Sequence, residues 1–267
     1  MSLDGFFDAV GYTTQESASI VQGPFLVGAD AKFDPPNVSD PYNPVPSQGK
    51  MIEFATPSFA SPTEQYKLLG TQSENGATFE PGTVDKLIVS WGRWIGNVDY
   101  TPSSGATTTI NFPAQGGLHY VVGLPTLPTQ IPSGATFTYN LAGATAPTDG
   151  INSPGTFTGT LVGDFINAKV GVQGMATVGG VAYSFQTTGF TTTGPQTNGI
   201  PLNVTATSNN FAQTGLGPIS FTGGCASGCA TDVSGAFYGA NASHAGIVYR
   251  INSFGAAEVT GAAAFAK

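Results

Sequence analysis

The run from Val233 to Lys267 constrains the fold most, because its apolar residues recur at every second position. A period of two is that of a β-strand with one buried face. The run therefore predicts short strands that close a β-structure, with a tight Gly/Asn-rich corner between the first two. The positions that share the buried faces are Val233, Gly235, Phe237 and Gly239, then Ile247, Tyr249 and Ile251, then Val259, Gly261, Ala263 and Phe265.

The same alternation begins near Val84 and continues through the last two thirds of the chain. It is clearest over Lys86–Ile95, Ala135–Leu141, Thr156–Phe165, and the pair Lys169–Val178 and Val181–Phe190, which Gly179-Gly180 would join as a hairpin. No amphipathic stretch long enough for a crossover helix separates these segments, so the sheet must be antiparallel. We predict an all-β fold, a closed antiparallel barrel whose last strand pairs with Lys86–Ile95; a two-sheet β-sandwich is the alternative.

Residues 1–83 show weak periodicity. The segment Asp34–Pro46 is rich in proline, asparagine and aspartate, which favours an extended loop over an interior strand. We therefore expect a loop-rich N-terminal extension over residues 1–83 and the barrel over residues 84–267. A small separate lobe is the alternative for the first part.

Composition excludes several classes of partner. Charged residues make up 9% of the chain and the net charge is −8, without a basic patch. Nucleic acids and anionic membranes are bound by clustered Lys and Arg, so neither partner is expected. Apolar runs are too short for a spanning helix, so no membrane insertion is expected. Low charge is typical of extracytoplasmic bacterial β-proteins, and the opening Met-Ser-Leu suggests a domain excised from a longer protein that carries the targeting segment.

Five segments resemble a known bacterial pattern: Ser90–Trp94 (SWGRW), Gly117–Thr126, the Cys225–Cys229 loop, Ser234–Ile251 and Val259–Lys267. Together they resemble the C-terminal region of FecR-domain-containing proteins of Gram-negative bacteria. The phrase GAFYGANASHAG is similar to the closing motif of the transferrin-binding protein B β-barrel, G-x-F-x-G-x-x-A-x-x-x-G. The resemblance implies an eight-stranded, lipocalin-like barrel on an exported protein, with a possible role in iron acquisition or FecR-type sensing.

The candidate binding residues are Trp91, Arg93, Trp94 and His119. Trp91 and Arg93 would share one face of a strand and Trp94 the other. A Trp/Arg pair at a barrel mouth could stack on a ligand, whereas the structural alternative is a plug that closes the barrel end. His119 alternates away from its apolar neighbours and is expected to face solvent.

The two cysteines, Cys225 and Cys229, are spaced for a small disulfide loop, which an oxidising compartment favours. Free thiols or a metal site are the alternatives. No metal-ligand spacing, catalytic motif or cofactor-binding fingerprint occurs, so we expect no catalytic residues, no metal, no cofactor and no enzyme activity.

The sequence thus favours a non-enzymatic extracytoplasmic binding module for an unknown protein or glycan. The alternative is a structural spacer or an adhesive domain without a small-molecule ligand. An open interior lined by polar groups would favour a small ligand, whereas an interior packed with Phe157, Leu161, Phe165, Phe185 and Phe237 would leave only the loops for ligands. The oligomeric state is not predicted.

Overall fold

The computed structural model describes residues 2–13, 29–33, 51–56, 64–79, 87–101, 105–123, 125–204, 209–213, 215, 217, 219–225, 228–253 and 258–267. Before Lys67 only the backbone is described. Strands dominate these ranges, and every strand pairing in them is antiparallel. The predicted all-β antiparallel class is confirmed.

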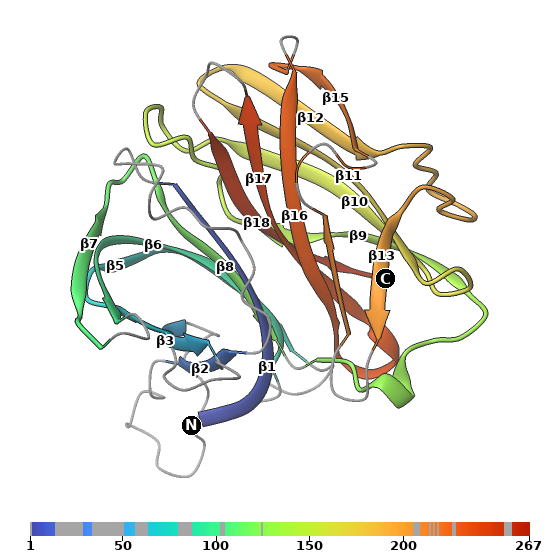
Figure 1. The fold of residues 1–267 in the computed structure, drawn as a ribbon, viewed down its shortest axis with the longest axis horizontal. Helices are drawn as coiled ribbons and strands as arrows, with labels where there is room; N and C mark the ends of the chain where they lie inside the picture. The colour runs from blue at the N-terminus through green and yellow to red at the C-terminus, as the bar shows by residue number, and fades with distance from the viewer. Residues whose placement is uncertain are drawn as a thin grey trace.

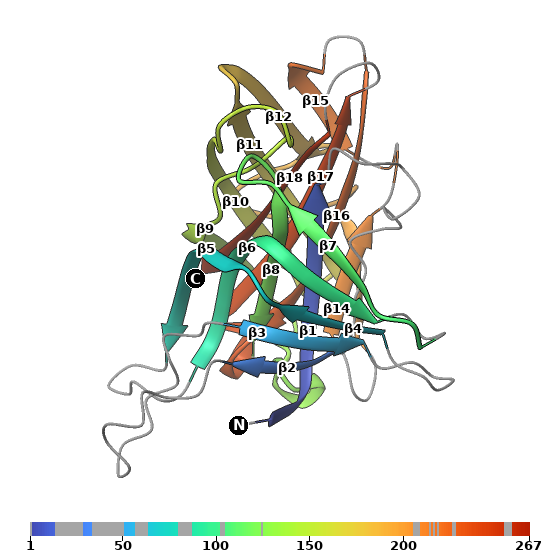
Figure 2. The same ribbon diagram turned by 90° about the vertical axis from the view of Figure 1, so that its left-hand side faces the viewer.

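The first sheet is built from the N-terminal strands. They run in the order β4-β3-β2-β1-β8-β6-β5, and β6 also pairs with β4 and β7 (Figure 2). Strands therefore occupy much of the described part of residues 1–83, for which the weak periodicity predicts a loop-rich extension. The bounds are β1 Ser2–Thr13, β2 Ala29–Phe33, β3 Met51–Thr56, β4 Glu64–Leu68, β5 Thr71–Phe79, β6 Leu87–Thr101, β7 Thr108–Phe112 and β8 Gly117–Gly123.

The second sheet closes on itself. Its pairings run β9-β10-β11-β13-β14-β16-β17-β18 and return from β18 to β9, a ring of eight strands in chain order. The predicted eight-stranded antiparallel barrel is confirmed. The bounds are β9 Thr136–Ala144, β10 Thr156–Asp164, β11 Lys169–Val178, β12 Val181–Thr187, β13 Ile200–Val204, β14 Asn209–Gln213, β15 Ile219–Gly223, β16 Cys229–Tyr238, β17 His244–Ser253 and β18 Val259–Ala266.

The predicted closing pair is wrong. The last strand, β18, does not pair with Lys86–Ile95; it pairs with β9, where Ala263 lies opposite Ala144. Strand β6 pairs with β5, β8, β4 and β7 in the first sheet instead. Alternation shows that a strand has a buried face but carries no information about which distant strand lies beside it. The division at residue 83 stays a prediction; strand pairing separates the sheets between Gly123 and Thr136.

The barrel interior is filled with aromatic rings. Phe157 stacks on Tyr249 at 4.9 Å and Phe165 lies 5.0 Å from Phe237 between ring centroids. Gly174 makes room for a further ring, that of Phe185, because a Cβ at position 174 would lie 2.6 Å from Cζ of Phe185. Of the two alternatives left open by the sequence, the structure has the packed interior, since its five candidate residues are all buried: Phe157, Leu161, Phe165, Phe185 and Phe237.

Small residues cover the opposite face of the closing strands. Ala236, Val248, Ala262 and Ala264 point out of the barrel, and β1, β6 and β8 of the first sheet pack against that wall (Figure 1). The two sheets therefore share a second apolar core. It explains why β16 and β18 are buried on both faces although their sequences alternate.

The corner between β16 and β17 is built from residues in the left-handed region. Gly239 has φ 72° and Asn241 φ 54°, and the short 3-10 helix η2 (Ala240–Ala242) lies between the strands. Glycine and asparagine adopt positive φ at the lowest cost. The Gly/Asn-rich corner expected from the sequence is present there.

Strands β12 and β15 branch from the ring. Lys169 and Val170 of β11 pair with β13, but Gln173–Val178 pair with β12, and β12 in turn pairs with β15. The four strands β10, β11, β12 and β15 thus form a continuous wall that leaves the barrel at one end (Figure 1). This wall carries the groove described below.

Candidate functional site

Trp91 lies at the junction of the two sheets and not at a barrel mouth. Its indole fits between Gly76 of β5 and Gly143 of β9, where added Cβ atoms would lie 2.3 and 2.1 Å from the ring. Both neighbours must be glycine for the ring to occupy this gap without displacement. The indole therefore joins the first sheet to the barrel.

Arg93 is buried beside Trp91 in a polar network. Its Nε donates to Oε1 of Glu74 at 2.8 Å, and its Nη1 donates to the carbonyl oxygens of Ala114 and Gly116 at 2.9 and 2.6 Å. Glu74 Oε2 accepts a hydrogen bond from the backbone N–H of Ala146, in the segment that follows β9. The ion pair thus links β5 and β6 to the barrel.

His119 is fully buried, so the prediction that it faces solvent is wrong. It lies directly opposite Arg93 in the β6–β8 pair, on the face that the barrel covers. Its Nδ1 and Nε2 are 2.7 and 2.8 Å from the hydroxyl oxygens of Thr145 and Thr148. Burial, and secondarily the charge of Arg93, hold the pKa of His119 well below 6.5, so the ring is neutral at pH 7.

Trp94 points the other way, as alternation predicted. It is fully buried and packs edge-on against Tyr120 at 6.0 Å between ring centroids, in the core of the first sheet. The structure thus brings Trp91, Arg93 and His119 together and leaves Trp94 apart. Their contacts favour a structural junction over a ligand site. Sequence reasoning missed Glu74, Thr145 and Thr148, because no motif marks them.

The cysteines and the second histidine lie elsewhere. Cys225 and Cys229 form a disulfide bond between the end of β15 and the start of β16. His244 Nδ1 lies 2.9 Å from Ser243 Oγ at the β16–β17 corner, and burial lowers its pKa. Within the described ranges, no three His, Cys, Asp or Glu side chains gather as metal ligands would.

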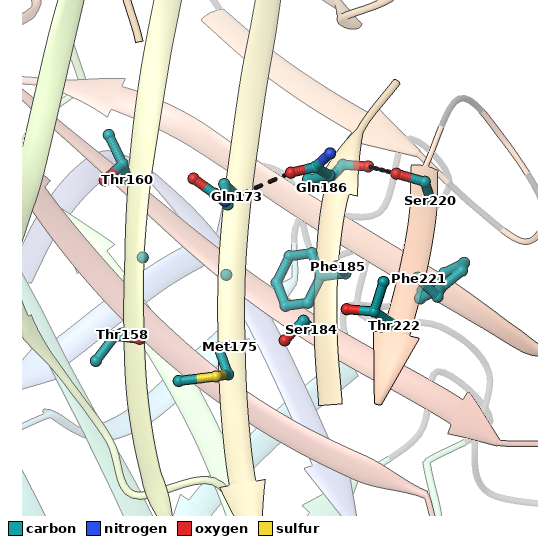
Figure 3. A pocket seen from close by; sticks show the side chains of 12 residues that line it. Thr158, Thr160, Gln173, Met175, Ser184, Phe185, Gln186, Ser220, Phe221 and Thr222 are labelled. Atoms are coloured by element: carbon teal, nitrogen blue, oxygen red, sulfur yellow. Dashed lines mark hydrogen bonds between the residues drawn. The ribbon is translucent and has the colours of Figure 1, made fainter. Parts of the chain in front are cut away.

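A groove of about 560 Å³ lies on the outer face of the wall formed by β10, β11, β12 and β15 (Figure 3). Strand register arranges its outward side chains in two rows across the four strands. One row is Thr160, Gln173, Gln186 and Ser220; the other is Thr158, Met175, Ser184 and Thr222.

The groove is uncharged and its lining is part polar, part apolar. Hydroxyl groups occur in both rows and amide groups in the first, Met175, Phe185 and Phe221 add apolar surface, and none of the lining residues is Asp, Glu, Lys, Arg or His. Gln173 Nε2 donates a long hydrogen bond of 3.4 Å to Gln186 Oε1; Gln173 is exposed and Gln186 is half-buried, and each amide has further donor and acceptor capacity that a ligand could use. No nucleophile and base lie together here, so the chemistry that these side chains offer is hydrogen bonding and apolar contact.

The segment after β12 covers the neighbouring part of this wall. Gln196 is buried over Gly171, whose missing side chain makes room for it, and the Gln196 backbone N–H donates to Asp164 Oδ2 at 2.8 Å. Asp164 also accepts hydrogen bonds from Ile166, Asn167 and the Asn167 amide, and these bonds lower its pKa against the opposing effect of burial. The wall is therefore covered around Gly171 and Asp164 and open at the groove.

Neither a protein-family model nor a curated protein matches the sequence. Two solved structures are similar over most of the chain. The apo haemoglobin receptor HpuA from Kingella denitrificans is 13% identical with a TM-score of 0.39, over 99% of this chain and 87% of that one. The isotype 1 transferrin-binding protein B from serogroup B Neisseria meningitidis is 11% identical with a TM-score of 0.35, over 96% and 56%.

These values carry no conclusion about what this chain binds. The chain spans about half the length of the transferrin-binding protein B chain. In the part of the chain that the structure describes, no helix has the length and apolar character needed to cross a bilayer.

Proposed function

We propose that the chain is a non-enzymatic, extracytoplasmic binding module of a Gram-negative surface or periplasmic protein, and that it binds an uncharged polar ligand in the groove. The observation that supports this most is that the barrel interior is filled with side chains while a groove on the outer wall is open. A filled interior leaves no room for a small molecule among the aromatic rings, so ligands must dock outside.

Two further observations support the proposal. Loops and surfaces on a rigid scaffold are the usual place of binding residues, and the groove lies on four regularly paired strands. Disulfides such as Cys225–Cys229 are favoured in oxidising compartments, which fits an extracytoplasmic location.

The test uses charge inside the neutral groove. Gln173→Glu and Gln186→Glu keep size and exposure but place a carboxylate among uncharged groups, where an uncharged ligand leaves it without a partner. The matched control is Gln130→Glu, an exposed position in the 3-10 helix η1 (Pro128–Gln130) on the loop before β9. Binding is measured on an array of neutral and acidic oligosaccharides and to purified haemoglobin and transferrin.

We expect binding that both groove variants weaken at least about tenfold and that the control leaves unchanged. Binding that the groove variants do not alter would place the site elsewhere. No binding to any probe would favour the alternative function, a structural spacer.

The narrower predictions of a role in iron acquisition or FecR-type sensing stay predictions, since no described contact bears on them. The haemoglobin and transferrin probes test the first directly. A protein or a glycan fits the groove chemistry equally, because both present hydroxyl and amide groups.

A further inference from the structure

Strand β15 has a partner on one side only among the described residues. It pairs with β12 over five consecutive positions, from Tyr183 opposite Gly223 to Thr187 opposite Ile219, with no register shift. Its other edge presents backbone N–H and C=O groups to which a further strand could pair, which would extend the sheet. This observation is independent of the ligand proposed for the groove.

The phase of the ladder shows which backbone groups point to the open edge. Just beyond the strand, the Gly224 N–H donates to the Ala182 carbonyl at 2.8 Å. Antiparallel hydrogen-bonded pairs alternate along a ladder, so Thr222 and Ser220 direct their backbone groups to β12 in the same way. Phe221, between them, directs its N–H and C=O to the open edge.

The edge lacks the features that normally prevent pairing. Exposed edges are blunted by charges, proline or bulges, and β15 (ISFTG) contains none of these. The edge strand β5 in the first sheet shows the contrast: it has two register shifts and contains Glu74. Within the described ranges, the edge of β15 is therefore open to a further strand.

The strand is complementary to itself. In an antiparallel pair centred on Phe221, Ser220 would face Thr222 of the second copy and the two Phe221 rings would face each other across the axis. A charged side chain next to the two-fold axis would lie close to its own copy on the second chain, so the lack of charge in β15 removes that repulsion. Phe221 is only partly buried and would gain apolar contact.

We infer that β15 pairs with β15 of a second copy of this chain, antiparallel, with the two-fold axis at Phe221. The two walls then become one continuous sheet, and the groove of each copy lies beside that of the other. An interface made mainly of one short strand is below the size of stable dimers, so we expect a transient dimer with a Kd on the order of 100 μM.

Sedimentation velocity over about 10 μM to 1 mM protein measures the association. Phe221→Pro removes the N–H that points to the open edge and leaves the β12 ladder intact, since proline is tolerated where that N–H faces solvent. Phe221→Ala is the matched control, because it removes the ring but keeps the N–H. We expect dimerisation to weaken severalfold in the alanine variant and to be lost in the proline variant.

A second pair of variants does not touch the backbone. Ser220→Lys places a cation next to the axis on an exposed side chain, and Thr158→Lys places one on the same wall but away from the edge. The first should abolish dimerisation and the second should not.

Hydrogen exchange followed by NMR gives a readout at single residues. The Ser220 amide should be protected at every concentration, whereas the Phe221 amide should gain protection only as the protein concentration rises. Amides of the edge strand β7 serve as the internal reference and should not change. A protein that stays monomeric up to 1 mM, or a Phe221 amide whose exchange does not depend on concentration, overturns the inference.

Discussion

Tyr249 and Tyr139 show how much a single buried hydroxyl depends on its partner. Both side chains are fully buried within the barrel core. The Tyr139 hydroxyl donates to the carbonyl oxygen of Ala242 at 2.7 Å, whereas the Tyr249 hydroxyl has no hydrogen-bond partner among the residues that the structure describes. Burial raises the pKa of both phenols, so both stay neutral.

Replacing the two tyrosines should have opposite effects. Tyr249→Phe removes a polar atom that lacks a partner and should leave the free energy of unfolding unchanged or raise it by about 1 kcal/mol. Tyr139→Phe leaves the Ala242 carbonyl unpaired and should lower it by about 1 kcal/mol or more. Urea denaturation of both variants measures the difference; equal effects would contradict the assignment.

His119 makes stability depend on pH. In the unfolded chain the imidazole takes up a proton near pH 6.5, but in the folded protein burial keeps it neutral. The unfolded state therefore binds more protons, and stability should fall as pH drops below 6.5, by about 1 kcal/mol per pH unit until the lower folded pKa is reached.

The measurement is the free energy of unfolding between pH 8 and pH 5 for the wild type, His119→Gln and His244→Gln. The glutamine at position 119 has nothing to titrate, so its profile should be flatter below pH 6.5. The variant at His244, whose pKa burial also lowers, should keep the steep part due to His119. A profile for His119→Gln as steep as that of the wild type would show that this ring is not the cause.

At the scale of single strands, the sequence predicts faces well and neighbours poorly. Alternation placed Trp91 and Arg93 on one face and Trp94 on the other, as the structure shows. It could not show that the first face is covered by the barrel, because burial by a second sheet depends on contacts far apart in the chain. For the same reason His119 was expected in solvent and the groove residues, ordinary Thr and Gln in the sequence, were not singled out.

The packing of Trp91 between two strands gives a prediction at this scale. Gly143→Ala should lower the free energy of unfolding by about 1–3 kcal/mol, because the new methyl group overlaps the indole. In a Trp91→Ala background the same change should cost little, since the ring is gone. A double-mutant cycle by chemical denaturation measures the coupling; additive effects would contradict the contact.

At the scale of the molecule, the chain has an eight-stranded barrel whose closing strands also pack against the first sheet. The barrel was predictable because glycine beside phenylalanine recurs along alternating strands, and the resemblance of the closing motif supplied the strand count. The identity of the strand that closes it was not predictable. Small residues such as Ala262 and Ala264 are compatible with an exposed barrel wall and with a buried one. Only the structure shows that the first sheet packs on this wall and buries it.

The closure of the barrel is tested most directly by NMR on the unmodified protein, through nuclear Overhauser effects between backbone protons of paired strands. The structure predicts such effects between β18 and β9, at Ala263 with Ala144 and at Phe265 with Leu141. Backbone effects from β18 to the segment Lys86–Ile95 in their place would show that the ring does not close at β9 and would contradict the eight-stranded barrel described above.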